Sequence, residues 1–422
     1  MTSKRAWALA ILLLLTSFAL VTSWALILRP IQVNILMPAS IAKSTAGLVR
    51  QFNNDHHGYI NLQVTQGPQD TEAMSDLAIS SLLLGKSPYD ALLIDVHWLP
   101  KYARAGWLTP LDPWIEQQEI DSLAPGAQLG NSYDDHLYRW PLMADMGLLY
   151  WRTDLISKPP RTPEELVKVS QRLQQEGKVP YGYIWQGRQY EGLSCVFLEV
   201  LDGFGGQWLT PGTDAVGLDS SASVKAAGWL RDLIISGVSP EAVVNYSEPE
   251  TLQAFKSGDA ALMRNWPYAW GEVQKDNSPI KGKVGVTTMV AAPGHTSTAT
   301  LGSWGFSILK GSSNPEAAAE AIAFLTSTYA QKQLFLNYSY TPTKATLFKD
   351  PELLSKSQIL PDLAKALQHT EQRPQTPLYA QISDVLQRQL SSILTSQGEL
   401  KTAMDRAQVN TEQILLAAGE TR

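Results

Sequence analysis

The segment YDALLID (residues 89–95) is the stretch from which the fold of this 422-residue chain is best read. Apart from Asp90 it is a short apolar run up to Ile94, which is typical of a strand buried on both faces of a parallel sheet. The run ends at Asp95, and the carboxyl ends of such strands are where α/β sheets open their binding crevices. A carboxylate at this point either faces a ligand or caps the next helix.

Two further strands and two helices precede this segment. Apolar and polar residues alternate in IQVNI (31–35) and in INLQVT (60–65), which predicts a strand for each. Helices are predicted between the strands, over residues 45–52 and 72–84, and Gly85 follows the second helix. The resulting β-α-β-α-β order predicts a parallel sheet with helices on its faces.

Length and composition favour two domains and exclude several classes of function. The 44% hydrophobic content is enough for a large core, and a net charge of −6 without a basic run argues against a nucleic-acid partner. The single cysteine, Cys195, lies in an apolar stretch and is expected to be a buried, inert thiol. Histidines do not have metal-ligand spacing, and no phosphate loop or nucleophile motif is present, so no metal, cofactor or catalytic residue is predicted.

The N-terminus indicates export. Lys4 and Arg5 precede an apolar run over residues 6–28, which is typical of a signal sequence. The run is also long enough to span a bilayer, so residues 1–29 are either a cleaved signal peptide or an N-terminal membrane anchor. No cysteine stands at the end of the run, which argues against a Cys-linked lipoprotein. We expect the protein in the periplasm or on the outer face of the cytoplasmic membrane.

A change of pattern marks the middle of the chain. LYRWPLMADMGLLYWR (137–152) predicts two extended pieces, broken at Pro141–Asp145, where the chain could cross from one lobe to another. Beyond it, Thr162 and Asn314 are predicted helix N-caps, each followed by proline. Other helices are predicted over 191–201, 223–235, 249–256 and most of 377–418, and strands over 283–289 and 303–309.

The segment ALMRNWPYAW (261–270) concentrates large aromatics after a strand-like run. Pro267 cannot continue a strand, so Trp266 and Tyr268 are expected on an irregular segment where the strand has just ended. Ligands of α/β sheets bind at such places. The alternative is a core turn filled by big side chains, since aromatics are common in cores.

Other irregular segments carry polar residues and further aromatics. Ring faces bury C–H surface, while carboxylates, amides and guanidinium groups form directional hydrogen bonds with hydroxyls. This combination of surfaces matches a sugar. The residues concerned are Asp95, Asp145, Trp185, Gln186, Tyr190, Glu191, Arg264, Trp266, Tyr268, Gly302, Ser303, Trp304 and Arg373.

Four stretches in order carry a resemblance to a known family. They are GYIWQGRQYEGLSCVFLEVL (182–201), FKSGDAALMRNWPYAW (255–270), LGSWGFSI (301–308) and RPQTPLYAQIS (373–383). The chain resembles the extracellular solute-binding proteins, family 1, of carbohydrate ABC importers, and within them most the trehalose/maltose-binding proteins. The resemblance implies an α/β, two-lobed periplasmic-binding-protein fold with a ligand cleft between discontinuous lobes, and a monomer without enzymatic activity. It implies two partners, a disaccharide-sized sugar and the transmembrane permease subunits.

The resemblance also assigns lobes and site residues. It implies one lobe from residues 30–141 plus about 296–345, and another from 142–295 plus about 346–422. Carboxylates bind glucose hydroxyls, aromatics form a platform, backbone near Gly302 contacts the sugar, and an arginine reaches it from the late helical region. Together with two polar residues of the 182–201 stretch, the predicted ligand-binding set is Asp95, Asp145, Gln186, Glu191, Trp266, Tyr268, Gly302, Ser303, Trp304 and Arg373.

Two departures from the family pattern leave the particular sugar open. Met143 stands where the most similar branch has a tyrosine, and the loop 38–40 lacks the expected acidic residue. Trehalose, maltose, sucrose and glucosylglycerol all fit the predicted size. Two rival functions use the same residues: a secreted glycoside hydrolase with Asp95 and Asp145 as its carboxylate pair, and a chemosensory sugar-binding protein that signals to a receptor.

Overall fold

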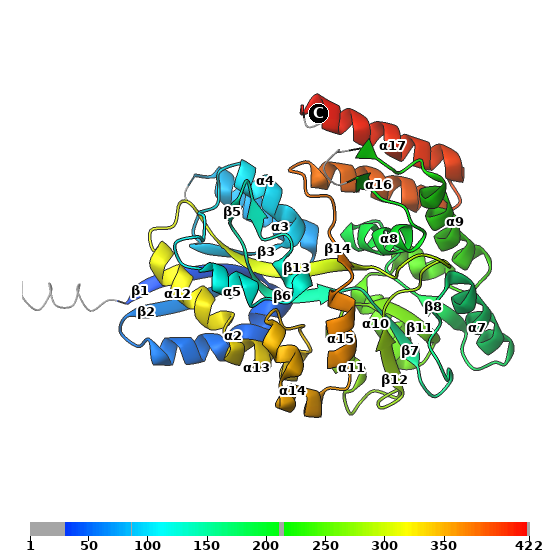
Figure 1. The fold of residues 1–422 in the computed structure, drawn as a ribbon, viewed down its shortest axis with the longest axis horizontal. Coiled ribbons are helices and arrows are strands. Elements are labelled where there is room, and N and C mark those ends of the chain that lie inside the picture. The colour runs from blue at the N-terminus through cyan, green and yellow to red at the C-terminus, as the bar shows by residue number, and fades with distance from the viewer. Residues whose placement is uncertain (1–29, 86, 211–214, 420–422) are drawn as a thin grey trace, which may run out of the picture.

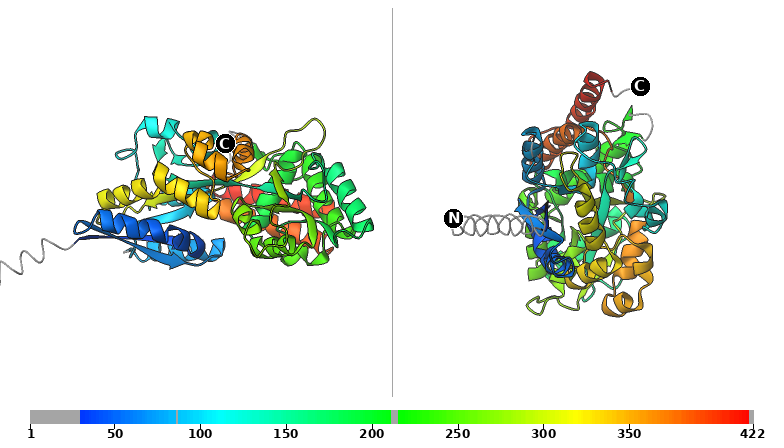
Figure 2. Two further views of the ribbon diagram at one scale, coloured as in Figure 1. Left: turned by 90° about the horizontal axis from the view of Figure 1, so that it is seen from below. Right: turned by 90° about the vertical axis from the view of Figure 1, so that its left-hand side faces the viewer.

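The computed structural model describes residues 30–85, 87–210 and 215–419. Two α/β lobes, each built on its own sheet, lie side by side (Figure 1) and keep this arrangement when viewed from below (Figure 2). The predicted export signal or anchor, residues 1–29, falls outside the described residues. Within the described ranges, no helix combines the length and the apolar character needed to cross a bilayer.

The first lobe contains a mixed sheet with the strand order β14-β13-β3-β1-β2, and β6 pairs with β13. β1 is parallel to both β2 and β3, which confirms the predicted β-α-β-α-β order. The later strand β13 runs antiparallel to β3 and β6, so the sheet is not purely parallel. Its strands are β1 (Ile31–Pro38), β2 (Ile60–Gly67), β3 (Ala91–Asp95), β6 (Trp140–Met146), β13 (Ala299–Ile308) and β14 (Thr370–Glu371).

Helices α2 (Ala39–Asp55) and α3 (Thr71–Leu83) connect the first three strands. α2 begins directly after β1, earlier than the predicted residue 45. No side chain caps its first turn, so the sequence lacks the usual signal for this helix start. α3 begins where Asp70 accepts a hydrogen bond from the Ala73 amide, as expected of an N-cap. After β3 the chain enters η1 (Val96–Trp98) and α4 (Leu99–Arg104).

The second lobe contains a four-stranded sheet with the order β12-β7-β11-β8. Its strands are β7 (Leu148–Arg152), β8 (Tyr181–Ile184), β11 (Ala260–Asn265) and β12 (Val284–Thr287). The helices around it are α7 (Pro163–Gln175), α8 (Glu191–Gly203), α9 (Ser221–Ile235), α10 (Glu248–Ser257) and α11 (Tyr268–Val273). The Thr162 cap of α7 is confirmed, because its side chain accepts a hydrogen bond from the Glu165 amide.

The predicted break at residues 141–145 is wrong in its position. β6 runs through Pro141 and Asp145 to Met146, and β7 starts at Leu148 in the other sheet. The β6–β13 pairing shifts register between Trp304 and Gly305, opposite Pro141, and such irregularities tolerate a proline within a strand. The chain therefore passes from sheet to sheet at Gly147. The lobe boundaries remain a prediction, but this pairing favours 147 over 141.

The C-terminal part covers both lobes. α15 contacts β6 of the first lobe and β12 of the second, and the apolar cluster that contains it includes residues of both sheets, whereas the sequence assigned residues 346–422 to the second lobe. α16 and α17 pack on α8 and α9 of the second lobe. These helices are α12 (Pro315–Leu325), α13 (Thr328–Tyr338), α14 (Pro351–Lys356), α15 (Leu360–Leu367), α16 (Tyr379–Leu394) and α17 (Leu400–Ala417).

The remaining short elements lie between these layers. They are α5 (Gln117–Asp121), α6 (Pro125–Gln128), β4 (Ser132–Tyr133), β5 (His136–Leu137), β9 (Leu209–Thr210), β10 (Ala215–Val216), η2 (Glu241–Asn245) and η3 (Ala345–Lys349).

Candidate ligand-binding site

A cavity of about 590 Å³ lies between the two lobes. The first lobe lines it with the ends of β3, β6 and β13, and the second lobe with the starts of α8, α10 and α11. Eight of the ten predicted site residues are brought together there: Asp95, Asp145, Glu191, Trp266, Tyr268, Gly302, Trp304 and Arg373. Gln186 and Ser303 do not line the cavity.

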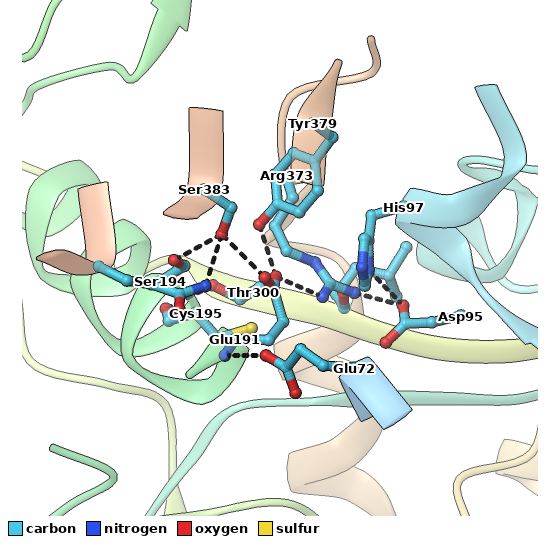
Figure 3. A network of polar contacts seen from close by, with 12 residues as sticks. Glu72, Asp95, His97, Glu191, Ser194, Cys195, Thr300, Arg373, Tyr379 and Ser383 are labelled. Carbon is cyan, nitrogen blue, oxygen red and sulfur yellow. Dashed lines mark hydrogen bonds and ion pairs between the residues drawn. The ribbon is translucent and has the colours of Figure 1, made fainter. Parts of the chain in front are cut away.

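A buried guanidinium group joins carboxylates from the two lobes (Figure 3). Arg373, in the segment between β14 and α16, is 1% exposed. It donates from Nη2 to Asp95 Oδ1 over 2.5 Å and from Nη1 to Glu191 Oε1 over 2.9 Å. Asp95 closes β3, whereas Glu191 opens α8. Arg373 is thus a bridge between the lobes as well as a cavity residue.

Asp95 is held in its ionised form. Burial by itself would raise its pKa, but the charge of Arg373, helped by His97, outweighs burial and holds the pKa of Asp95 well below its usual range. The Nδ1 atom of His97 lies 3.1 Å from Asp95 Oδ1. The Asp95 side chain makes no capping hydrogen bond to η1, so of the two sequence interpretations the helix cap is wrong.

Glu191 is positioned by α16. Its Oε1 accepts from the Tyr379 hydroxyl over 2.5 Å, and its Oε2 accepts from Ser383 Oγ over 2.9 Å. With Arg373, these contacts fill much of its hydrogen-bonding capacity, as Figure 3 shows. Glu191 therefore shapes one wall of the cavity with a fixed orientation.

Asp145 is the carboxylate with the least compensation. It lies within β6, and its Oδ1 accepts from the Thr341 amide over 2.9 Å. Burial raises the pKa of Asp145 to about 6, and only the hydrogen bonds with Thr341 act against this. Because no cation offsets its charge among the described residues, a ligand hydroxyl is a fitting partner for its free lone pairs.

The Trp266 ring is fixed on three sides. Its Nε1 donates to Glu248 Oε1 over 3.1 Å, and the Arg264 guanidinium lies 3.9 Å from the ring centroid. A Cβ on Gly302 would come within 2.6 Å of the ring, so only glycine lets Trp266 lie this close to the β13 backbone. Trp304 is half-buried and packs edge-on against Trp98, with ring centroids 5.4 Å apart.

Tyr268 is not on an irregular segment as expected. It is the first residue of α11, and Pro267 before it already has helical dihedral angles. Proline is compatible with a helix start because the backbone N–H that it lacks would have no partner within the helix at that position. Trp266 does lie between β11 and α11, so the prediction of an irregular segment holds for that residue alone.

Gln186 belongs to a polar network behind the cavity. Arg264 forms a bidentate pair with Glu199, at 2.9 and 2.5 Å, and also donates to Gln186 Oε1. The Gln186 amide donates in turn to Thr251 Oγ1 over 2.8 Å. Gln186 thereby supports Arg264, which lies under the Trp266 ring. A direct ligand contact by Gln186 remains only a prediction.

Ser303 ties two strands of the first sheet together. Its hydroxyl accepts from Arg139 Nη2 and donates to the Met143 carbonyl, each over 2.7 Å. The predicted backbone contact to a ligand at this residue stays a prediction.

Several cavity residues were absent from the predicted set. Arg188, Glu248 and Tyr340 are among them. Glu248 is the first residue of α10. The Ser247 capping box and the proline that follows mark this helix start in the sequence, so this signal could have pointed to Glu248. Nothing in the local sequence distinguishes Tyr340, which reaches the cavity from beyond α13 only through the tertiary fold.

Comparison with known proteins places the chain in a family. Residues 38–332 match the bacterial extracellular solute-binding proteins. A probable ABC transporter-binding protein of Deinococcus radiodurans is 33% identical over 349 residues, which cover 80% of this chain and 82% of the relative. A maltotriose-binding protein of Pyrococcus abyssi is 25% identical over 309 residues, covering 72% of this chain and 65% of the relative.

A solved structure has the same fold at similar identity. The maltose-bound MalE3 protein of T. maritima superposes with a TM-score of 0.85 at 32% identity, covering 92% of this chain and all of that one (100%). This chain belongs to the bacterial extracellular solute-binding protein family.

Proposed function

We propose that the protein is the sugar-binding subunit of an ABC importer and captures a disaccharide-sized α-glucoside outside the inner membrane. Closure of the two lobes would then deliver the sugar to the permease. The observation that carries this proposal is the cavity between the lobes, which combines the ring surfaces of Trp266 and Trp304 with the carboxylates of Asp95 and Asp145.

The size and lining of the cavity support a small polar ligand with apolar faces. A volume of about 590 Å³ lies well within the range of small-molecule sites. Each ring covered by a sugar contributes ~1–3 kcal/mol by burial. Two or three such rings, together with charge-assisted hydrogen bonds, account for micromolar affinity, which corresponds to about −8 kcal/mol.

The α-glucoside assignment rests on similarity and on the placement of the carboxylates. The T. maritima protein of the same fold is maltose-bound at 32% identity. Met143 is 2% exposed and lines the cavity from β6, the strand that also carries Asp145. An apolar side chain there offers no hydrogen bond to a sugar hydroxyl, so we expect Met143 to influence which α-glucoside is preferred.

We also propose that the protein binds its sugar without hydrolysing it. A glycoside hydrolase needs one carboxyl group as proton donor and a second as nucleophile or base. Asp95 is held ionised, and its Oδ1 is engaged by Arg373. The raised pKa of Asp145, about 6, would suit a proton donor, but the other carboxylate of the pair is not free to act because Arg373 already holds Asp95. The arrangement favours hydrogen bonding over general acid–base chemistry.

A thermal-shift screen tests the proposal. Trehalose, maltose, sucrose, glucosylglycerol and maltotriose would be compared with the pentitol ribitol as a non-glucoside control. A ligand at about 100 times its dissociation constant adds ~2.7 kcal/mol to the free energy of unfolding, which is readily measured. We expect at least one α-glucoside to stabilise the protein. Stabilisation by ribitol alone would contradict the α-glucoside class, and steady glucose release from any of the disaccharides would contradict a pure binding function.

A further inference from the structure

The first turn of α3 touches the second lobe across the cleft. α3 follows β2 in the first lobe, whereas the segment from Arg188 to α8 belongs to the second lobe. Asp70 and Glu72 at the start of α3 both contact this segment. Figure 3 shows the Glu72 carboxylate directed at the first turn of α8.

Glu72 caps α8 from the opposite lobe. The Glu191 amide, the first of this 13-residue helix, donates to Glu72 Oε1 over 2.8 Å. Tyr190 occupies the N-cap position of α8 but makes no side-chain capping hydrogen bond. The first amides of a helix need acceptors from outside the helix, and a carboxylate is favoured there by the helix dipole. Glu72 thus supplies an acceptor that α8 lacks in its own chain segment.

Asp70 adds a second contact beside the first. The Arg188 Nη2 atom lies 3.3 Å from Asp70 Oδ2. The Arg188 guanidinium lies over the Tyr190 ring, 4.4 Å from the ring centroid. The backbone amide of Arg188 donates to the Tyr246 carbonyl. Asp70 is fixed as the N-cap of α3. Both partners are therefore anchored within their own lobes before they meet.

We propose that this first turn of α3 is a clasp that holds the cleft closed over the sugar, with Glu72 as a positioning residue that sets affinity without lining the cavity. The inference rests on the proposed sugar-binding function. Separation of the lobes breaks the Glu72 contact and leaves the first amide of α8 without its acceptor. A contact made only in the closed form is what a closure equilibrium requires.

The clasp also acts on the cavity wall. Glu191 carries the amide that Glu72 accepts from, and its carboxylate orients Arg373, which in turn contacts Asp95. Loss of the Glu72 contact therefore loosens a residue that frames the cavity. We expect faster sugar release more than slower capture, because the clasp forms only after the lobes have met.

The charges around Glu72 give the clasp a pH dependence. The carboxylates of Glu191 and Asp70 act on it, and Arg188 pairs with Asp70. Burial raises the pKa of Glu72 to about 7, and the negative charges of Glu191 and Asp70 act in the same direction. The hydrogen bond from the Glu191 amide acts against this rise. The closed form then binds a proton more tightly than the open form does. Closure strengthens as the pH falls through this pKa and weakens above it, and the effect is small because the Glu72 residue is exposed to solvent.

The test compares Glu72→Ala, Glu72→Gln and the control Asp76→Asn, an exposed carboxylate one turn further along α3. Maltose and trehalose serve as probes, and dissociation is followed by tryptophan fluorescence in stopped flow between pH 5 and pH 8. Glu72→Ala should release sugar about tenfold faster, the effect of one lost hydrogen bond to a charged group. Glu72→Gln keeps an acceptor, so it should restore most of the slow release. It should lose the part of the pH dependence centred near pH 7 and keep the part that Asp145 contributes near pH 6. Asp76→Asn should behave as wild type.

Small-angle scattering separates a failure of the clasp from a failure of the proposed function. Wild type with sugar should be more compact than Glu72→Ala at the same subsaturating sugar concentration. Release from Glu72→Ala at the wild-type rate, with unchanged compaction, would overturn the clasp while leaving sugar binding intact. If wild type binds neither probe, the proposed binding of these disaccharides is wrong. The release comparison is then made with whichever ligand of the thermal-shift screen stabilises wild type, and equal release rates from wild type and Glu72→Ala would overturn the clasp.

Discussion

Gly302 is the residue where close packing bears most directly on the site. Adding a Cβ there would bring it within 2.6 Å of the Trp266 ring, which must then move. We expect Gly302→Ala to weaken sugar binding by about 1–2 kcal/mol, because the displaced ring covers less of the ligand. Calorimetric titration measures the effect. Gly311→Ala is the matched control, since a Cβ there meets nothing within 4 Å.

At Asp145 the requirements of sugar binding and of protein stability oppose each other. Its pKa is raised from the usual 3.8 to about 6, so the folded protein holds the proton more tightly than the unfolded chain, and stability from this group is lost as the pH rises through about 6. The difference corresponds to roughly 3 kcal/mol above that pH. Asp145→Asn should therefore stabilise the sugar-free protein at pH 8 but not at pH 4, while its sugar affinity falls. Urea unfolding at the two pH values measures this, and equal stability changes at both would contradict the argument.

Arg373 is a poor choice for a clean test of closure. Its guanidinium is buried between Asp95 and Glu191, and Arg373→Ala would leave both carboxylates without their cation. Removing one partner of a buried ion pair typically costs about 3–5 kcal/mol. We expect a large fall in melting temperature for Arg373→Ala even without sugar. A variant with wild-type stability would show that the cluster is not held by this charge.

At the scale of elements, Gly147 marks the passage of β6 into β7. A Cβ at this residue would lie 1.8 Å from Glu199 Oε1 and 2.6 Å from Arg264 Nη2, so the buried Glu199–Arg264 pair would have to move. Gly147→Ala should destabilise the protein by about 1–3 kcal/mol through overpacking. Chemical denaturation checks this, with Gly311→Ala again as the control, and unchanged stability would show that the pair has room to shift.

Elements with clear periodicity or caps could be predicted from the sequence, whereas those fixed by distant contacts could not. The strands around residues 31–35 and 60–65 and the Thr162 cap are confirmed, because alternation and capping are local properties. Pro141 was misread as a strand break, since the register shift that accommodates it depends on β13, about 160 residues further along the chain.

The same distinction applies to the site. Asp95 could be placed at the cavity from its position at the end of a strand-like run, whereas Asp145 could be placed there only through the resemblance to the family. The roles of Glu72 and Gln186 depend on partners far along the chain, the Glu191 backbone amide and the Arg264 guanidinium respectively, and no spacing in the sequence reveals these pairs. The particular sugar is undetermined for a similar reason, because it depends on the shape of the cavity around Met143.

At the scale of the whole molecule, the proposed function requires two lobes that enclose a sugar without altering it. Residues from both lobes line the cavity. Of the residues that connect the lobes, Arg373 and Asp70 belong to this lining and Glu72 lies outside it. Ligand contacts from both lobes can exist together only in the closed form. Part of the free energy of sugar binding is then used to close the lobes. A shift of the closed-to-open population ratio from 1:99 to 99:1 takes about 5.5 kcal/mol.

Calorimetric titration of the protein with maltose and trehalose tests this account most directly. The account predicts one-site binding of at least one disaccharide near micromolar affinity, about −8 kcal/mol, and a loss of about 2 kcal/mol in a folded Trp304→Ala variant. The absence of binding by either sugar at millimolar concentration, or an affinity that Trp304→Ala leaves unchanged, would contradict it.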